Sequence, residues 1–260
     1  MDKEVAFITG ATSGIGAAFA CHFAREGYDL IITGHSDDKI SPCVDELQEK
    51  YKVNVQIILA ELADENNVLK IEEIIKKNNK IEVLINNAGF GLVKPFWLED
   101  IRNLENMIKV HINAPVRFIH AALPNMILKK KGVIINLSSL SSFMPIPQDS
   151  MYSATKLFQN SFLESLHISV REKGIKVQVL CPGFVLTNFH NKAGWKQSEL
   201  KNRGIVRWMQ PEKVVDISVK NLRKKNKVIV IPGCWNKLVK FIFDILPRRF
   251  YYRLAFKYLQ

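Results

Sequence analysis

The sequence contains few cysteines and no cluster of metal-binding side chains. Its four cysteines, Cys21, Cys43, Cys181 and Cys234, form no C-x-x-C pair, and no histidines lie at the spacing of metal ligands. This pattern suggests neither a disulfide framework nor a zinc site. We therefore expect reduced thiols and no metal.

Long apolar runs are absent as well. No uncharged apolar segment approaches the roughly 18 to 20 residues that a membrane span needs. The first residues, Met1 to Glu4, lead directly into a strand-like run and leave no room for a signal peptide. These absences predict a protein that is made and kept in the cytoplasm.

Basic residues outnumber acidic ones, but they do not gather. The formal net charge is +12, and the lysines and arginines are spread along the chain without aromatic-interleaved repeats or a recognised binding module. Nucleic acid is therefore not an expected partner. The positive field instead helps to attract anionic cofactors or acyl-carrier phosphates.

Hydropathy patterning predicts the fold. The 260 residues are 47% hydrophobic and 24% charged, with no linker or repeat, so one α/β domain is expected. Short Val- and Ile-rich runs alternate with amphipathic stretches, as in a parallel sheet covered on both faces. We predict a Rossmann-type doubly wound sheet of about seven strands with helices on both faces. The expected strands are 4–9, 28–33, 54–60, 81–86, 132–138, 175–181 and 227–231.

A glycine-rich turn follows the first expected strand. Val5 to Thr9 runs into Gly10-Ala-Thr-Ser-Gly14-Ile-Gly16 and then into a helix-forming stretch. Glycines at such a turn let the backbone approach a diphosphate, which the amides of a helix N-terminus stabilise. The context fits a dinucleotide site, although the motif alone is also found in ordinary turns.

A second motif combines a phenol, an ammonium and a hydroxyl. Tyr152 and Lys156 lie four residues apart in Y-S-A-T-K, and Ser139 lies thirteen residues upstream at the end of an expected strand. On a helix, four-residue spacing puts the first two side chains on one face. Such a pair by itself usually marks a helix surface. With Ser139 and the glycine turn, it predicts a proton-transfer site.

With these motifs the sequence resembles the short-chain dehydrogenase/reductase family, from about Lys3 to about Gly233. Three further elements carry the resemblance: Asn86-Asn87-Ala88-Gly89, Asn113, and Pro182-Gly183 followed by Thr187. The resemblance implies an NAD(P)-dependent oxidoreductase that acts on a ketone or secondary alcohol. The alternative is a catalytically idle NADP(H)-binding sensor or partner-binding protein. Such a protein would have no physical reason to keep all the catalytic residues.

The resemblance also implies catalytic roles. Tyr152 exchanges the proton, and the Lys156 ammonium is expected to lower the pKa of that phenol. Lys156 also binds the nicotinamide ribose, and Ser139 holds the substrate oxygen. Asn113 fixes a water that links Lys156 to solvent, unless its side chain bonds only the local backbone. A nucleophilic-serine hydrolase is excluded because no Gly-x-Ser-x-Gly motif is present.

Cofactor choice is read at the end of the second expected strand. NAD-preferring relatives have an acid at the Gly34 position, and NADP-preferring ones usually have Arg at the His35 position. His35 and Ser36 donate hydrogen bonds to a 2′-phosphate, so NADP is predicted. Asp37, Asp38 and Ser13 keep NAD as the alternative. The expected cofactor-binding residues are Gly10, Thr12, Ser13, Gly14, Ile15, Gly16, His35, Glu61, Asn86, Ala88, Gly89, Tyr152, Lys156, Val185 and Thr187.

Loops at the carboxyl ends of the expected strands contain many apolar side chains. They predict a pocket for a lipid-like, steroid-like or acyl ketone, although aromatic residues in loops are more often packing. In segment 188–210 they are Phe189, Trp195, Ile205, Trp208 and Met209. Elsewhere they are Phe90, Phe96, Trp97, Phe143, Met144, Ile146 and Pro147.

The last segment, 234–260, is crowded with aromatic and basic residues. We interpret it as a helical extension of the domain formed by 1–233, with its apolar face packed on this subunit or a partner. Contact with a membrane interface is the less favoured alternative. Helices expected at 98–128 and 151–173 resemble the family's dimer faces, which predicts a homodimer or homotetramer.

Overall fold

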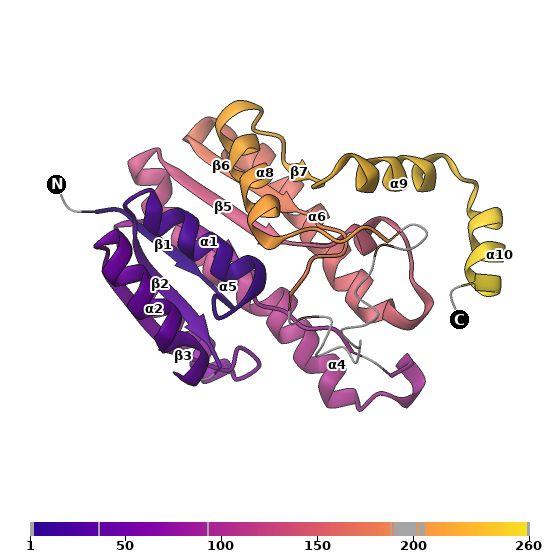
Figure 1. Ribbon diagram of the computed structural model, residues 1–260, viewed down its shortest axis with the longest axis horizontal. Coiled ribbons are helices and arrows are strands. Elements are labelled where there is room, and N and C mark those ends of the chain that lie inside the picture. The colour runs from indigo at the N-terminus through magenta and orange to yellow at the C-terminus, as the bar shows by residue number, and fades with distance from the viewer. Residues whose placement is uncertain are drawn as a thin grey trace.

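A seven-stranded, wholly parallel sheet forms the centre of the molecule (Figure 1). The computed structural model describes residues 3–35, 37–92, 94–187, 189, 202 and 206–258. The strand order is β3-β2-β1-β4-β5-β6-β7, which confirms the predicted Rossmann-type fold. The strands are β1 Val5–Ile8, β2 Asp29–Gly34, β3 Val55–Leu59, β4 Ile81–Asn86, β5 Gly132–Leu137, β6 Ile175–Leu180 and β7 Ile229–Val230.

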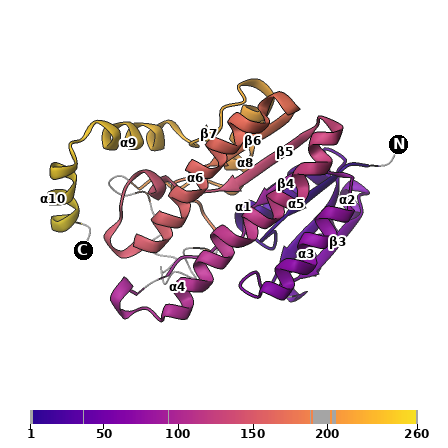
Figure 2. The same cartoon turned by 180° about the vertical axis from the view of Figure 1, so that it is seen from behind.

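Helices cover both faces of this sheet (Figures 1 and 2). Helices α1, α2 and α8 pack on one face, and α3, α5 and α6 on the other. Their bounds are α1 Gly14–Arg25, α2 Asp37–Tyr51, α3 Glu65–Lys77, α5 Ala114–Lys129, α6 Ser150–Val170 and α8 Pro211–Lys224. The chain therefore has the two-sided cover that its near-continuous apolar strands predicted.

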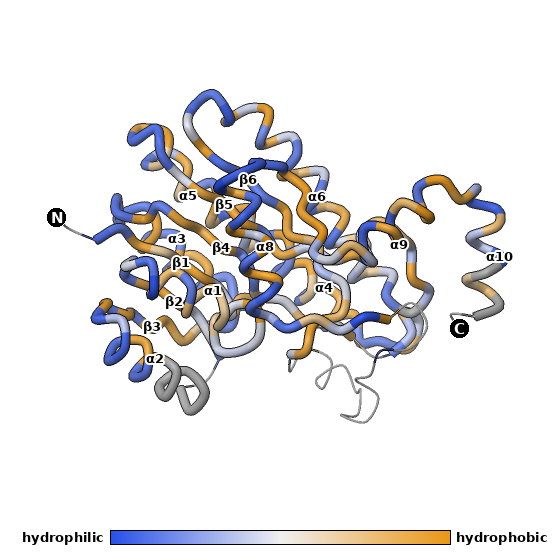
Figure 3. The backbone as a smooth tube through the Cα atoms, turned by 45° about the horizontal axis from the view of Figure 1, so that its top comes forward, coloured by the Kyte–Doolittle hydropathy of each residue, from blue (hydrophilic) through white to orange (hydrophobic). Residues whose placement is uncertain are grey.

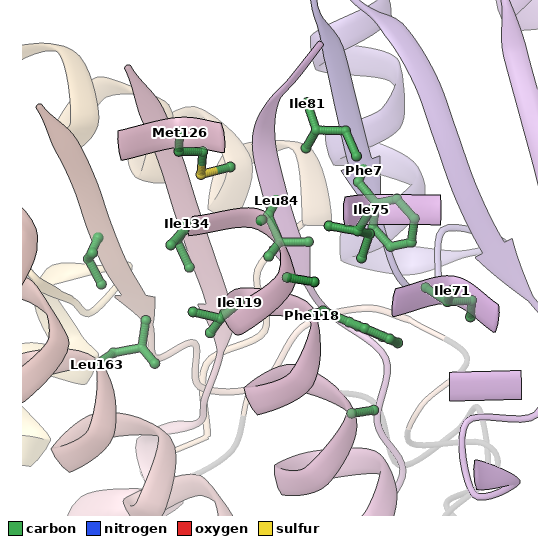
Figure 4. Packing of buried hydrophobic residues seen from close by; sticks show 14 of the residues in the cluster. Phe7, Ile71, Ile75, Ile81, Leu84, Phe118, Ile119, Met126, Ile134 and Leu163 are labelled. Carbon is green, nitrogen blue, oxygen red and sulfur yellow. The ribbon is translucent and has the colours of Figure 1, made fainter. Parts of the chain in front are cut away.

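Alternate residues of each strand enter two separate cores. Phe7 of β1 joins the core under α3 and α5, whereas Ile8 joins the core under α1. Phe7 and Phe118 lie side by side in the first core, with ring centroids 6.1 Å apart (Figure 4). Hydrophobic residues accordingly concentrate along the strands (Figure 3). Because both faces of the sheet are buried, a ligand can reach the sheet only at the ends of the strands. In folds of this type it binds beyond their carboxyl ends.

All seven expected strands are present, with small differences at their ends. β7 is the shortest, Ile229–Val230, although the sequence predicted a strand over 227–231. Its pairing with β6 is limited to two residues on each strand. Only this short part of the apolar run contributes to the sheet.

The helix expected at 98–128 is broken into several pieces. A 3-10 turn, η1 Phe96–Leu98, precedes α4 Ile101–Ile108, and a π-helical turn, η2 Lys109–Asn113, joins α4 to α5. At the junction the Ala114 N–H donates to the Lys109 carbonyl, five residues earlier. Pro115 explains the break, because it lacks an N–H and its ring conflicts with the carbonyl four residues before it, that of His111.

Short helical turns and two terminal helices complete the chain. The turns η3 Leu140–Phe143 and η4 Pro147–Asp149 connect β5 to α6, and η5 Arg171–Lys173 follows α6. Helices α9 Cys234–Ile245 and α10 Arg248–Tyr258 project from the body on the side opposite the N-terminus (Figure 1). Among the described residues, no helix has the length and apolar content to cross a membrane.

Candidate active site

The glycine-rich turn connects β1 to α1 with two residues in the left-handed region. Gly10 has φ of 64° and Gly14 has φ of 59°, conformations that glycine adopts without strain. Gly16 is required by close approach, because a Cβ there would lie 2.3 Å from the Gly10 carbonyl oxygen. Thr12 and Ile15 are half-buried and Ser13 is exposed. The first turn of α1 contains no acidic side chain, so its amides form a surface suited to a diphosphate.

Side chains from β1 and β4 hold this turn in place. The Thr9 hydroxyl accepts hydrogen bonds from the backbone N–H groups of Asn87 and Ala88, both at 3.0 Å. The Asn87 amide donates to the carbonyls of Thr9 at 2.9 Å and Gly10 at 2.8 Å. The motif after β4 is therefore bonded directly to the glycine turn.

His35 and Glu61 meet beyond the ends of β2 and β3. Nδ1 of His35 lies 3.1 Å from Oε2 of Glu61, and their side chains are 67% and 52% exposed. The structure thus brings together two residues that the sequence assigned to the adenosine end of the cofactor. Ser36 lies outside the described residues, as do the side chains of Asp37 and Asp38.

Ser139, Tyr152 and Lys156 converge at the end of β5. Ser139 lies two residues after the end of β5 and caps η3, its hydroxyl accepting from the Ser141 N–H at 3.2 Å. Tyr152 and Lys156 lie in the first two turns of α6, with Nζ 5.5 Å from the centroid of the tyrosine ring. Nζ also donates to the Leu137 carbonyl at 2.8 Å, so the lysine stem is buried against the strand end. The predicted proton-transfer constellation is assembled.

Burial sets the protonation of this group. It raises the pKa of the Tyr152 phenol above its ordinary value, and a hydrogen bond with Ser139 only partly opposes that shift. Burial also lowers the pKa of Lys156 to about 8. This differs from the expectation that the Lys156 ammonium lowers the tyrosine pKa: desolvation is the largest cause of the shift, and it raises the pKa. Tyr152 is accordingly a neutral phenol at pH 7, the form that donates a proton.

Asn113 does not join Tyr152 and Lys156. It is exposed and lines a separate groove together with Glu65 and Phe158. His111, two residues earlier, is buried beside the site, with its ring centroid 5.7 Å from that of Tyr152. Asn113 therefore lies apart from the Ser139, Tyr152 and Lys156 group, and its role in fixing a water stays a prediction from the resemblance.

Both ring nitrogens of His111 are hydrogen-bonded. The Phe90 N–H donates to Nε2 at 3.0 Å, so this nitrogen carries no proton in the neutral ring. Nδ1 then donates to the Thr155 hydroxyl at 2.9 Å, and Thr155 donates to the Tyr152 carbonyl at 2.8 Å. Burial, and next the Lys156 charge, hold the pKa of His111 well below its usual value. A neutral histidine thus links the loop after β4 to the first turn of α6.

Three buried amide side chains form a row that is joined by hydrogen bonds and ends at the His111 carbonyl. Asn86 donates to Asn136 at 2.9 Å, Asn136 donates to Gln159, and Gln159 donates to the His111 carbonyl. That carbonyl is free to accept because Pro115, four residues later, has no N–H. Asn86 was predicted to contact the cofactor, but its side chain is buried in this row. Asn136 and Gln159 were not identified from the sequence; their polar side chains on buried elements were the available signal.

Gly89 lies close to His111, and Ala88 lies close to the glycine turn. A Cβ at Gly89 would lie 2.9 Å from Nε2 of His111 and 3.5 Å from Nζ of Lys156. A side chain at position 89 would therefore displace the His111 ring, whereas its distance from Lys156 would be an ordinary contact. Ala88 is half-buried against the glycine turn, its Cα 2.9 Å from where a Gly10 Cβ would be.

Val185 and Thr187 lie in the segment that follows β6. Val185 is buried and forms a parallel bridge with Met209, and Thr187 contacts the glycine turn, 2.7 Å from a Cβ built on Gly14. Phe189 lies 5.9 Å from Tyr152 by ring centroids. Trp195 and Ile205, also predicted to line the pocket, lie outside the described residues.

A small hollow beside Tyr152, with a volume of about 10 Å³, is lined by both apolar and polar residues. Phe96 lines it as predicted, whereas Trp97 is 78% exposed and is not among the lining residues. Lys94 and Asp149 are the charged residues at the hollow, and burial raises the pKa of Asp149. The lining residues are Leu92, Lys94, Phe96, Leu104, Met107, Asp149, Ser150, Met151 and Tyr152.

Comparison with known proteins agrees with this geometry. Residues 4–198 match the family model described as short chain dehydrogenase. The chain is 36% identical to the human very-long-chain 3-oxoacyl-CoA reductase over 188 residues, which cover 71% of this chain and 60% of that protein. It is 31% identical to the bovine protein of the same name over 258 residues, 97% of this chain and 78% of that protein. This chain thus spans less than two thirds of the human relative.

A solved structure is also similar over almost the whole chain. The short-chain dehydrogenase from Sphingobium yanoikuyae in complex with NADPH has a TM-score of 0.83 and 26% sequence identity. The match covers 94% of this chain and 96% of that one. The likeness thus extends beyond the residues that match the family model.

Proposed function

The chain belongs to the short-chain dehydrogenase family and is an oxidoreductase, and on this premise we propose that it is an NADPH-dependent reductase of apolar ketones. The substrate class that suits it best is a 3-oxoacyl thioester with a long acyl chain. The single observation that carries the chemistry is the convergence of Ser139, Tyr152 and Lys156 at the end of β5. An idle cofactor-binding protein is not favoured, because it would have no use for this group.

Reduction of a ketone requires a proton donor at the carbonyl oxygen. NADPH, when bound, supplies the hydride. The neutral Tyr152 phenol donates the proton to the developing alkoxide, and the Ser139 hydroxyl holds that oxygen in place. Lys156, with a pKa of about 8, is mostly protonated at pH 7 and stabilises the phenolate that remains. The raised pKa of Tyr152 keeps its phenol protonated, which is the state that reduction of a ketone requires.

We propose His111 as a positioning residue. Its ring joins the Phe90 N–H to Thr155, which holds the carbonyl of Tyr152 itself. Because the ring is neutral and fully hydrogen-bonded, it is suited to orientation rather than to proton exchange.

The cofactor preference is argued from the adenosine end. The glycine turn, Thr187 and the loop at Ala88 and Gly89 would hold the dinucleotide, with Lys156 at its ribose. No acid follows β2 at Gly34, and His35 is exposed and able to donate to a 2′-phosphate. The bacterial relative of known structure holds NADPH. NADP is therefore the proposed cofactor, and NAD is the alternative.

The acyl substrate is proposed from two observations. The small hollow beside Tyr152 is lined in part by Leu92, Phe96, Leu104 and Met107, which offer apolar contacts to the start of an acyl chain. The human and bovine relatives are named for very-long-chain 3-oxoacyl-CoA reduction. Lys94, at the same hollow, adds a positive charge for an anionic carrier.

The assembly and the domain limits are part of the proposal. We propose one domain, 1–233, with 234–260 as its helical extension, forming a homodimer or homotetramer in the cytoplasm. Ile101 of α4 and Leu157 and Phe158 of α6 are exposed apolar residues that suit a subunit contact. Light scattering of the purified protein measures the subunit number, and a monomer would contradict this assignment.

The test is NADPH oxidation with 3-oxoacyl-CoA substrates of graded chain length. We expect turnover that rises with chain length, is greater with NADPH than with NADH, and is absent in Tyr152→Phe. Turnover on short polar ketones alone would overturn the acyl assignment. Tight NADPH binding without turnover on any ketone would favour an idle binder.

A further inference from the structure

Helix α9 exposes large apolar side chains on the side that does not pack on the body. Asn236 and Val239 are buried, and Phe243 and Lys240 are half-buried on the same side of the helix. On the other side Leu238, Phe241, Ile242 and Ile245 are 45%, 58%, 45% and 64% exposed. Their spacing of three and four residues places them in one stripe along the helix.

Helix α10 repeats this arrangement. Tyr251 and Ala255 are buried, four residues apart, and anchor the helix. Phe250, Tyr252 and Phe256 are 57%, 56% and 73% exposed. Large aromatic residues that remain this exposed on two consecutive helices form an apolar surface that monomeric proteins rarely keep without a partner.

Basic residues accompany the exposed aromatics. Segment 234–260 contains six lysines and arginines and a single acid, Asp244, which pairs with Lys240. Lys237 on α9 and Arg248, Arg249 and Arg253 on α10 are exposed. A cationic helix with an aromatic and aliphatic face is the composition that binds the interface of an anionic bilayer.

The two helices are fixed to the loops of the active site. Nζ of Lys240 lies 5.0 Å above the ring of Phe143, and the Tyr251 hydroxyl donates to the Pro145 carbonyl. Both partners belong to the connection between Ser139 and Tyr152. Asn236 packs on Gly183, where a Cβ would lie 2.8 Å from its Oδ1. The segment is thus held against the loop between Ser139 and Tyr152. It projects away from the sheet (Figures 1 and 3).

We propose that α9 and α10 bind the surface of an anionic membrane and hold the catalytic cleft beside it. The exposed stripe of α9 and the aromatics of α10 enter the interface, and the arginines of α10 contact lipid phosphates. A second copy of this chain is the weaker occupant, because two segments with six bases and one acid each repel one another. The binding does not depend on which ketone the enzyme reduces.

Flotation of the full chain with vesicles tests the proposal. One set of vesicles is phosphatidylcholine alone, and the other contains about one third phosphatidylserine. We expect binding to the anionic vesicles that weakens with salt, and at least tenfold less partitioning to the neutral ones. Equal flotation with both sets, or none with either, would overturn the proposal.

Matched variants locate the surface. The double variant Phe241→Ser/Ile245→Ser should reduce binding at least tenfold, since both side chains are exposed and their loss leaves the core intact. The control is Leu128→Ser/Ile168→Ser, which removes two exposed apolar residues from α5 and α6 and should leave binding unchanged. Circular dichroism confirms that both variants are folded. An equal effect of the two pairs would contradict the assignment.

Charge reversal tests the electrostatic part. Arg249→Glu/Arg253→Glu should lower binding to anionic vesicles by more than tenfold, because each base near such a surface contributes about fivefold. Lys224→Glu/Lys225→Glu makes the same change in net charge at the end of α8 and should have little effect. Light scattering without lipid gives the remaining outcome. Dimers that the α9 variant abolishes, together with no vesicle binding, would assign the stripe to a second copy and overturn the proposal.

Discussion

The two ends of the cleft differ in how tightly their polar groups are held. At the catalytic end His111 is 1% and Lys156 is 5% exposed, and each hydrogen-bonds to groups from other elements. At the adenosine end His35 and Glu61 are 67% and 52% exposed and pair chiefly with each other. The buried end is therefore suited to one chemistry, and the exposed end can change its ligand preference at little structural cost. Substitutions at the two ends should separate these roles.

Tyr152→Phe should have the largest effect on turnover. Loss of the phenol removes the only proton donor proposed at the substrate oxygen, so kcat should fall by about 10³-fold. The ring and its contacts remain, and the Kd for NADPH should change less than about threefold. Stopped-flow turnover and a fluorescence titration measure the two quantities. Parallel loss of both would contradict the role of Tyr152.

Lys156→Ala should reduce both turnover and cofactor affinity, because the ammonium is proposed to serve both. In the unaltered enzyme the pKa of Lys156 is lowered to about 8, so kcat for reduction should fall as pH rises through that value. The folded lysine loses its proton before the unfolded one does. Stability should therefore gain from this group as pH rises from about 8 toward about 10.4. Chemical unfolding across that range, with Lys156→Met as the reference that lacks the gain, checks the sign.

His111→Leu should affect turnover less and stability more. It leaves the Phe90 N–H and the Thr155 hydroxyl without their partner, which costs about 2–4 kcal/mol of unfolding free energy. We expect kcat to fall about tenfold as the first turn of α6 loosens, with a smaller fall in His111→Asn. A full loss equal to that of Tyr152→Phe would show that the ring exchanges protons.

Protonation of His111 also makes the free energy of unfolding depend on pH. Its folded pKa lies well below 6.5, so the unfolded chain binds a proton that the folded protein does not. Stability from this group is present above about pH 6.5 and is lost as pH falls below it. The same unfolding experiment on His111→Leu should show a shallower loss between about pH 6.5 and 5.

His35→Asp should have the smallest effect of these variants and act on preference alone. A carboxylate there would repel a 2′-phosphate, so the ratio of NADH to NADPH affinity should rise about tenfold. Both side chains of the pair are exposed, and the unfolding free energy should change by less than about 0.5 kcal/mol. An unchanged ratio would remove His35 from the cofactor site.

Periodic features of the sequence were the ones that predicted the structure. The apolar runs located all seven strands, and the spacing of Ser139, Tyr152 and Lys156 predicted that these three residues meet, because a strand end and a helix turn have fixed geometry. The π-helical turn was not predicted, since one widened turn leaves no periodic signal. The sequence therefore gave no indication that His111 is buried beside Tyr152. The pKa of Tyr152 was also misjudged, because desolvation depends on the surrounding side chains and not on the tyrosine-lysine spacing.

The missing N–H of Pro115 should couple two positions that are distant in the sequence. The His111 carbonyl that it frees is the acceptor for Gln159, 48 residues beyond His111 in the chain. Pro115→Ala would return a local donor to that carbonyl and put it in competition with Gln159. Gln159→Leu, in turn, would be better tolerated after Pro115→Ala than before it. A double-mutant cycle should show this epistasis, and homologues that lack the proline should be free of the constraint on the glutamine.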